Sequence, residues 1–368
     1  MGYDRSMPVG KHFDVVDDDE DAFQIFETLN ERGLPLSKSN LIKNHIISKM
    51  NSETAQGEIS DEWNQIFDDI IGTDQKDDDF IRESLRSRYF DRHKISDKTV
   101  KASKKSLYKI IKANIGSGSD PRENERDVKK FVSDLRADSK FVKLLNEPSR
   151  YPDGETKDAI FAIKALSGDH IRVPIITAFR EWGGVDNDEY KKLVNFLVKF
   201  FFRIRIVIGE HPGEIDKTMI ECASKIKDGE SAEEIINFLK EKDDAATFEW
   251  NFENNFVPKS EQVANYVLSA ITLHLGSPNS DVRPVGKLTV EHILPKNPEK
   301  SEWTAFFDNY KGNAQKKLGK FTYKIGNQTL LTQPINSAVS NKGFDKKKNY
   351  AILMRHHVFI SGTIYCYC

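Results

Sequence analysis

The sequence predicts a mainly α protein with a small α+β unit toward its C-terminal end. Between residues 126 and 275 apolar side chains recur with the spacing of amphipathic helices, and short breaks containing Gly or Pro separate the segments. The periodicity changes after "GSPNSDVRPVGK" at 276–287, a stretch typical of a linker. "KLTVEHIL" and "FTYKIGNQTLL" then alternate as short strands do, and residues 336–350 return to helical spacing.

The N-terminal part is predicted to begin with a helix, a turn and a second helix over residues 19–50. Phe23, Phe26 and Leu29 share one helical face, and "NERGLPLS" breaks the pattern before "NLIKNHIISKM". Residues 51–125 alternate helical segments with polar breaks. The apolar cluster at 196–208 predicts core packing, with its two arginines as either buried ion-pair partners or phosphate contacts.

Bulk composition narrows the class of protein. A chain of 368 residues favours two or three domains, and 38% hydrophobic with 30% charged residues is typical of a soluble protein. The longest apolar stretch is interrupted by basic residues, so no membrane span is expected. Cys222, Cys366 and Cys368 form neither a disulfide framework nor a paired zinc motif, which favours the cytoplasm.

The charge is unevenly distributed along the chain. A net charge of −2 argues against a protein that coats nucleic acid through bulk attraction. Acidic runs such as "DVVDDDEDAF" lie in the first eighty residues, whereas "KGNAQKKLGKFTYK" and "KGFDKKK" lie between 311 and 348. These lysines are either a solvated face or contacts for a nucleic-acid backbone.

A group of polar residues near the basic segment suits phosphodiester hydrolysis, which needs a base and a cation. A histidine such as His292 can act as the base, and carboxylate and amide oxygens suit Mg²⁺ or Mn²⁺. Glu291 and His292 are adjacent on a predicted strand, where successive side chains diverge. One can therefore face a metal while the other faces water, and Asn336 would complete the metal site. Alone, His292 would be a structural histidine.

"EHILP", "NQTLL" and "NSAVSNK" together resemble the HNH, or His-Me finger, endonucleases. Asn336 follows Asn327 by nine positions, as that family's pattern requires. The resemblance implies that His292 is the general base, that Glu291 and Asn336 are metal ligands, and that Asn327 holds the loop and orients the histidine. Asn327 could instead be a plain hairpin residue, since Gly-Asn favours turns.

The surrounding segments extend the resemblance. "VEHILPKNPEKSEW" and "INSAVSNKGFDKKKNY" resemble the C-terminal nuclease domain of GmrSD-type modification-dependent (type IV) restriction enzymes. "AFQIFETLNERGLPLSKSNLIKNHI" resembles the end of the ParB-like NTP-using domain of the same enzymes. Asn30, Gly33 and Lys43 match that pattern as a nucleotide-binding remnant, although the first two could simply shape a turn and Lys43 could be solvated. Lys342 and Lys320 are expected to contact DNA phosphate.

The resemblance implies a domain order. It places a remnant of the ParB-like domain at 1–50, a helical domain at 51–280, a ββα-metal (HNH-like) nuclease domain at 281–354 and an atypical tail at 355–368. Both termini are expected to be truncated relative to the family. The D-G-Q-Q-R-type motif is missing, so NTP use is expected only of a full-length form.

The implied activity is cleavage of foreign double-stranded DNA, carrying modified cytosine, in phage defence. Mg²⁺ or Mn²⁺ is the expected cofactor, no membrane partner is expected, and a homodimer is left open. The alternative is a catalytically silent DNA-binding or regulatory module that retains the nuclease fold.

Overall fold

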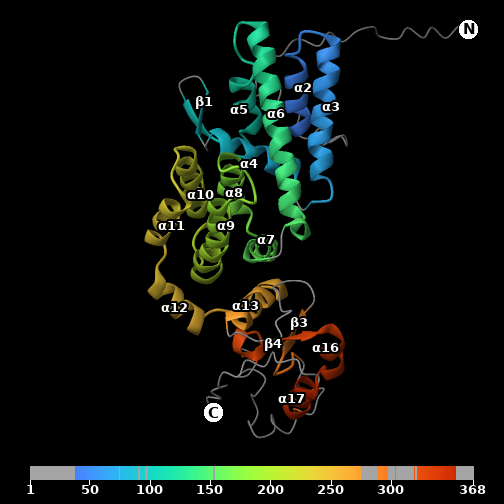
Figure 1. The fold of residues 1–368 in the computed structure, drawn as a ribbon, viewed down its shortest axis with the longest axis vertical. Helices are drawn as coiled ribbons and strands as arrows, with labels where there is room; N and C mark the ends of the chain where they lie inside the picture. The colour runs from blue at the N-terminus through green and yellow to red at the C-terminus, as the bar shows by residue number, and fades with distance from the viewer. Residues whose placement is uncertain are drawn as a thin grey trace, which may run out of the picture.

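The computed structural model describes residues 38–73, 75–89, 92–95, 98–151, 154–274, 288–296, 303, 319 and 321–353. These residues confirm a mainly α protein with a small α+β unit: most of them lie in helices, and the C-terminal strands pair near the lower end of the molecule (Figure 1). Asn30, Gly33, Lys320 and the 276–287 stretch lie outside the described residues. Within the described ranges, no helix is long and apolar enough to cross a membrane.

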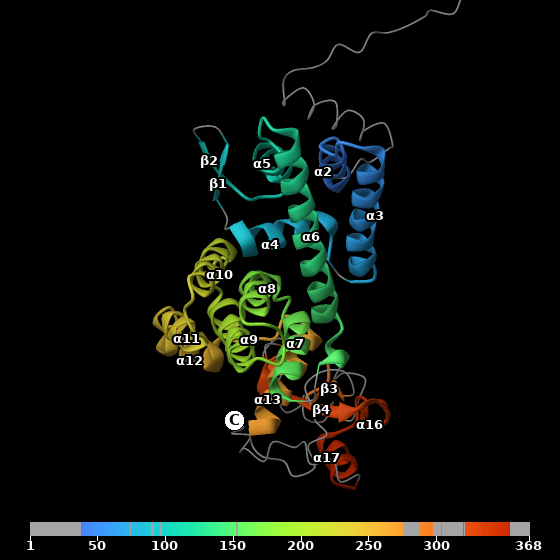
Figure 2. The ribbon, with the colours of Figure 1, turned by 45° about the horizontal axis from the view of Figure 1, so that its top comes forward.

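One end of the molecule is a group of four helices, in which α3 and α6 run side by side (Figures 1 and 2). Ser52 and Asp120 cap α3 and α6 by accepting hydrogen bonds from backbone N–H groups of the first turn, and Pro121 occupies the first helical position of α6. The four helices are α2 (Lys38–Ile47), α3 (Glu53–Ile70), α5 (Leu107–Asn114) and α6 (Pro121–Asn146).

A helix and a hairpin connect this group to the centre. Helix α4 (Asp77–Tyr89) crosses the molecule between α6 and the central helices (Figure 2). Strands β1 (Arg92–Ile95) and β2 (Lys98–Lys101) pair antiparallel. The sequence pattern did not predict this hairpin, because its eight residues are rich in lysine and arginine and lack apolar alternation.

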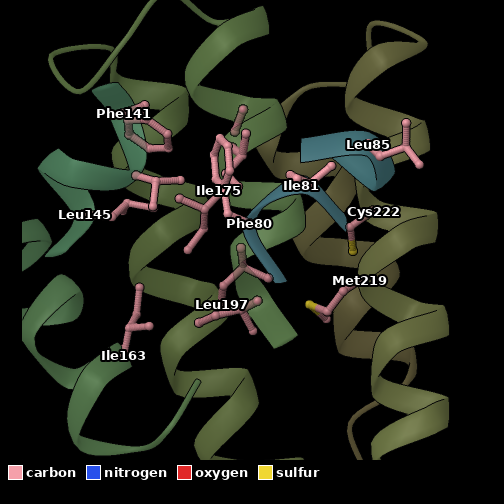
Figure 3. Packing of buried hydrophobic residues seen from close by; sticks show 14 of the residues in the cluster. Phe80, Ile81, Leu85, Phe141, Leu145, Ile163, Ile175, Leu197, Met219 and Cys222 are labelled. Carbon is pink, nitrogen blue, oxygen red and sulfur yellow. The ribbon is translucent and has the colours of Figure 1, made fainter. Parts of the chain in front are cut away.

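The central helices surround a continuous apolar core. Figure 3 shows Phe80 of α4 beside Ile175, with Phe141 of α6 on one side and Met219 and Cys222 on the other. The helices are α7 (Glu155–Ala165), α8 (Arg172–Glu181), α9 (Asp188–Phe201), α10 (Pro212–Lys227) and α11 (Ala232–Glu241), with a short 3-10 helix η2 (Asp169–Ile171) before α8.

The apolar cluster at 196–208 packs as predicted. Helix α9 continues as a π-helical segment, η3 (Phe202–Ile208), and ends at Gly209, whose φ of +89° suits glycine. Arg203 pairs with Asp243 at 2.5 Å and lies 3.9 Å over the ring of Phe248, so it is an ion-pair partner. Arg205 donates to the carbonyl of Glu210 at 3.0 Å.

The C-terminal unit is a two-stranded antiparallel sheet with helices on both faces. Its elements are α12 (Ala245–Asn254), α13 (Glu261–His274), β3 (Leu288–His292), η5 (Ile325–Asn327), β4 (Gln328–Thr332), α16 (Gln333–Val339) and α17 (Phe344–Leu353). The expectation of a strand over "FTYKIGNQTLL" is partly wrong, since β4 begins only at Gln328 and a 3-10 turn precedes it. Helix α13 joins the unit to the rest, because Val263 and Val267 belong to the central core while Ala264 and Leu268 pack on the sheet.

Truncation of Leu330 to alanine should test how much the sheet depends on α13. Leu330 is fully buried in a small cluster with Ala264, Leu268 and Val290. A cavity there should lower the free energy of unfolding by about 3 kcal/mol, within the usual range for Leu→Ala. Chemical denaturation measures the loss. Val257→Ala, at a position that is 40% exposed, is the control; an equal effect of both variants would contradict the packing described.

Candidate active site at the end of strand β3

The register of the sheet places Glu291 and His292 on opposite faces. Leu288↔Thr332 and His292↔Gln328 are the outermost pairs of the ladder. Val290 packs toward α13, and His292, two residues on, shares that face of the strand. Glu291 points to the other face, where α17 contacts it. The divergence expected from adjacent strand positions is therefore present.

His292 lies in a partly buried position on the α13 face. Its Nε2 is 3.3 Å from Nε2 of Gln328, the residue opposite it on β4, and its ring meets that of Tyr323 edge-on at 5.6 Å between centroids. Burial, with the nearby positive charges of Lys296 and Lys347, lowers the pKa of His292 to about 4. The imidazole is therefore neutral at neutral pH, the form that can accept a proton.

Asn327 holds the loop that follows β3. Its Oδ1 accepts from the backbone N–H of Leu294 at 2.8 Å, and its Nδ2 donates to the carbonyl of Leu294 at 3.0 Å and to that of Thr322 at 2.9 Å. Its own carbonyl accepts from the N–H of Ile293 at 2.8 Å. Asn327 thus fixes the chain directly after His292 without contacting the imidazole through these bonds.

Asn336 reaches the Glu291 face of the sheet from α16. Its Nδ2 donates to Oγ1 of Thr289 at 2.8 Å and to the carbonyl of Val290 at 3.3 Å. Thr289 and Glu291 share a face because they are two residues apart on one strand. These hydrogen bonds therefore hold Asn336 beside β3 at Thr289, two residues before Glu291.

Lys347 is a site residue that the sequence pattern did not predict. It is 4% exposed, and its Nζ contacts Glu291 Oε1 at 2.5 Å, the carbonyl of His292 at 2.8 Å and the carbonyl of Ile293 at 3.3 Å. Burial raises the pKa of Glu291, and the contact with Lys347 opposes that shift. The sequence "DKKKN" contains three consecutive lysines, and nothing in this pattern indicates which of them is buried.

The donor atoms on this face fit a hard cation. A carboxylate and an amide oxygen are the ligand types that Mg²⁺ and Mn²⁺ take, and Glu291 and Asn336 carry them. The ammonium of Lys347 already contacts three oxygens here, among them Oε1 of Glu291, so a metal ion bound to Glu291 would share this carboxylate with Lys347. In the described part of the chain no group of three His, Cys, Asp or Glu residues could hold a metal. An ion bound here would therefore keep several waters, as Mg²⁺ commonly does.

Two further predicted residues lie elsewhere. Lys342 is partly buried in the turn between α16 and α17, where its carbonyl accepts from Nε1 of Trp303 at 3.0 Å. Lys43 donates to Oδ1 of Asn64 at 2.8 Å and so links α2 to α3. Neither contact joins the group around Glu291 and His292.

The pKa of His292 can be measured directly. Because burial favours the neutral ring, we expect its NMR ring signals to stay at their neutral positions from about pH 8 down to about pH 5.5, whereas an ordinary histidine titrates near 6.5. The spectrum of His292→Ala assigns the signals. A midpoint at or above the ordinary value would contradict the buried position.

The pairing of Lys347 with Glu291 predicts a large effect on stability. Lys347→Met leaves a buried carboxylate without its partner, so the free energy of unfolding should fall by about 3 kcal/mol or more in chemical denaturation. Lys240→Met, at an exposed position on α11, is the control and should change it by less than about 0.5 kcal/mol. The double variant Glu291→Gln/Lys347→Met should recover part of the loss. Equal effects of the two lysine variants would refute the ion pair.

The sheet and its helices lie within a segment that resembles a known domain. A family model described as GmrSD restriction endonucleases, C-terminal domain, matches residues 241–361. No curated protein matches the chain. The match starts before the boundary expected at 281, and so includes α13, the helix that covers the sheet. Residues 241–361 are therefore similar to the C-terminal domain of GmrSD restriction endonucleases.

Proposed function

We propose that the chain is an HNH-type, divalent-metal-dependent DNA endonuclease. The observation that carries the proposal is the pair at the end of β3, where a neutral imidazole and a carboxylate occupy opposite faces of one strand. The domain match supports nuclease activity on DNA. A phosphodiester bound at the end of β3 would meet the base on one side and the metal ligand on the other.

His292 takes the role of general base. A base must be unprotonated before it removes a proton from water, and the lowered pKa of His292 ensures that state. The negative charge of a bound phosphodiester raises the pKa of a nearby histidine. His292 would therefore become a stronger base once DNA is bound, while Asn327 keeps the following loop in place.

Glu291 and Asn336 would hold Mg²⁺ or Mn²⁺. When bound, such an ion stabilises the charge that develops on the phosphate and the leaving oxygen. Lys347 contacts Oε1 of Glu291, so the carboxylate is already oriented by a positive charge. Lys347 is then a positioning residue, because it fixes the carboxylate of Glu291 and the carbonyls of His292 and Ile293 at the end of β3.

The substrate class and setting follow from the family. We infer foreign double-stranded DNA with modified cytosine as the substrate, phage defence as the role and the cytoplasm as the compartment. The domain match supports a restriction nuclease in general. The lysines of 311–348 supply the positive charge that a DNA backbone requires.

A catalytically silent DNA-binding module is the second candidate. The observation in its favour is that both metal-ligand candidates have protein partners: Lys347 on Glu291, and Thr289 and Val290 on Asn336. The two candidates differ in metal binding. A silent module has no need of Mn²⁺ at Glu291, whereas the nuclease should lose Mn²⁺ binding in Glu291→Gln.

Cleavage by His292→Ala tests the proposed base. With Mg²⁺ or Mn²⁺ present, the rate should fall by about 10²–10⁴-fold on glucosylated-hydroxymethylcytosine DNA and on unmodified DNA, the usual scale for a lost general base. His274→Ala, at an exposed position at the end of α13, is the matched control. Circular dichroism confirms folding. Full activity of His292→Ala, or cleavage without any divalent ion, would overturn the assignment.

A further inference from the structure

A second polar site lies in the helical part of the chain. It is a partly enclosed cavity of about 280 Å³ between α4, η2, the start of α8 and α10. In Figure 1 α4 and α10 lie near the middle of the molecule, whereas β3 and β4 lie near its lower end. The cavity is therefore separate from the candidate active site.

Basic side chains outnumber the carboxyl groups in the wall of the cavity. Asp79 pairs with Arg82 at 3.3 Å and with Lys104 at 2.8 Å. Asp216, on α10, pairs with Arg86 at 3.3 Å and with Nδ1 of His170 at 2.6 Å. Asp79 and Asp216 thus each pair with two basic side chains. The five cationic side chains in the wall are Lys76, Arg82, Arg86, Lys104 and Arg172.

The remaining carboxyls do not balance this charge. Asp169 pairs with Arg172 at 3.2 Å but is 71% exposed. Glu83 is 5% exposed and accepts from Nε2 of Gln75 at 2.5 Å. Burial raises the pKa of Glu83 to about 7, so near neutral pH it carries less than a full negative charge. Even if it were fully ionised, four carboxylates would face five cations.

One donor of the wall is unsatisfied. Within the part of the chain that the structure describes, Nε of Arg82 is buried and has no hydrogen-bond partner. A buried N–H group without an acceptor is costly, so the hydrogen-bonding capacity of Arg82 is not fully used within the described structure. Arg172 is held in place, since its NH1 donates to Oε1 of Gln75 at 2.9 Å.

We propose that this cavity binds a small phosphate-bearing anion through Arg82, Arg86 and Arg172. Guanidinium groups form strong paired hydrogen bonds with phosphate oxygens, and an excess of positive charge favours a multiply charged anion over a monovalent one. The volume suits a phosphate or diphosphate group and its immediate surroundings. This inference stands independently of the proposed nuclease activity.

The anion would also connect two parts of the helical body. Arg82 and Arg86 lie on α4, which leads from the N-terminal helices, whereas Arg172 opens α8 and Asp216 lies on α10. A ligand held by all three arginines would cross-link α4 and α8. Binding is therefore expected to raise the unfolding temperature of the chain.

The test is a titration of the whole chain with inorganic pyrophosphate by calorimetry, supported by thermal unfolding. Arg82→Gln is the informative variant, because its ion pair with Asp79 lies between partly exposed side chains and its loss should leave the fold intact. The dissociation constant should rise at least tenfold. Arg126→Gln, at a 76% exposed side chain on α6, is the matched control and should bind as the parent does.

The titrations distinguish a small-anion site from an ion-pair network and from a site for a DNA backbone. Pyrophosphate binding that weakens in Arg82→Gln and Arg172→Gln but not in Arg126→Gln supports the site. No binding at millimolar pyrophosphate, or binding that Arg82→Gln leaves unchanged, overturns it and leaves an ion-pair network that only joins helices. A duplex DNA arm decides the source: if DNA displaces pyrophosphate from the parent and shows the same arginine dependence, the ligand is a DNA backbone and the small-anion proposal fails.

Discussion

The candidate active site depends on the register between β3 and β4. Both strands have five residues: β3 carries Glu291 and His292, and β4 begins with Gln328, the partner of His292. Asn327 directly precedes β4. A slip of one residue would exchange the two faces, so that the carboxylate met α13 and the imidazole met Lys347. A two-stranded sheet is marginal in water, and here α13 covers one face while α16 and α17 cover the other. The covering helices therefore maintain the register as well as the site.

Electrostatics on the Glu291 face impose a second constraint. A buried carboxylate needs a cation or proton, and Lys347 supplies the cation at 2.5 Å. A divalent ion that used Glu291 would meet this ammonium and would be repelled by it. DNA phosphates carry the opposite charge and reduce that repulsion. Metal and DNA are thus expected to favour each other's binding at this site, because each compensates the charge that opposes the other.

The sequence was sufficient to predict what depends on local pattern. Helical periodicity identified most of the helices, and the Glu-His pair with two asparagines led to one small unit of structure. It could not predict contacts that depend on tertiary position. Lys347 differs from the neighbouring lysines only through the packing of α17 on the sheet, which the sequence does not reveal. The cavity around Arg82 is lined by residues that range from 75 to 216 in the chain. The β1–β2 hairpin was missed because its charged strands carry no apolar alternation.

Helix α13 contacts both the central helical core and the β3–β4 sheet. One set of its side chains, including Val263 and Val267, belongs to the central core, and another packs on the sheet. Its polar residues also hold β3: Nδ2 of Asn265 donates to the carbonyl of Leu288 at 2.7 Å, and Glu261 accepts from the N–H of Val290 at 3.3 Å. A rigid helix fixed at both faces cannot shift in the core without moving the strand that carries His292. Changes in the packing of the helical body would therefore reach the candidate active site through α13.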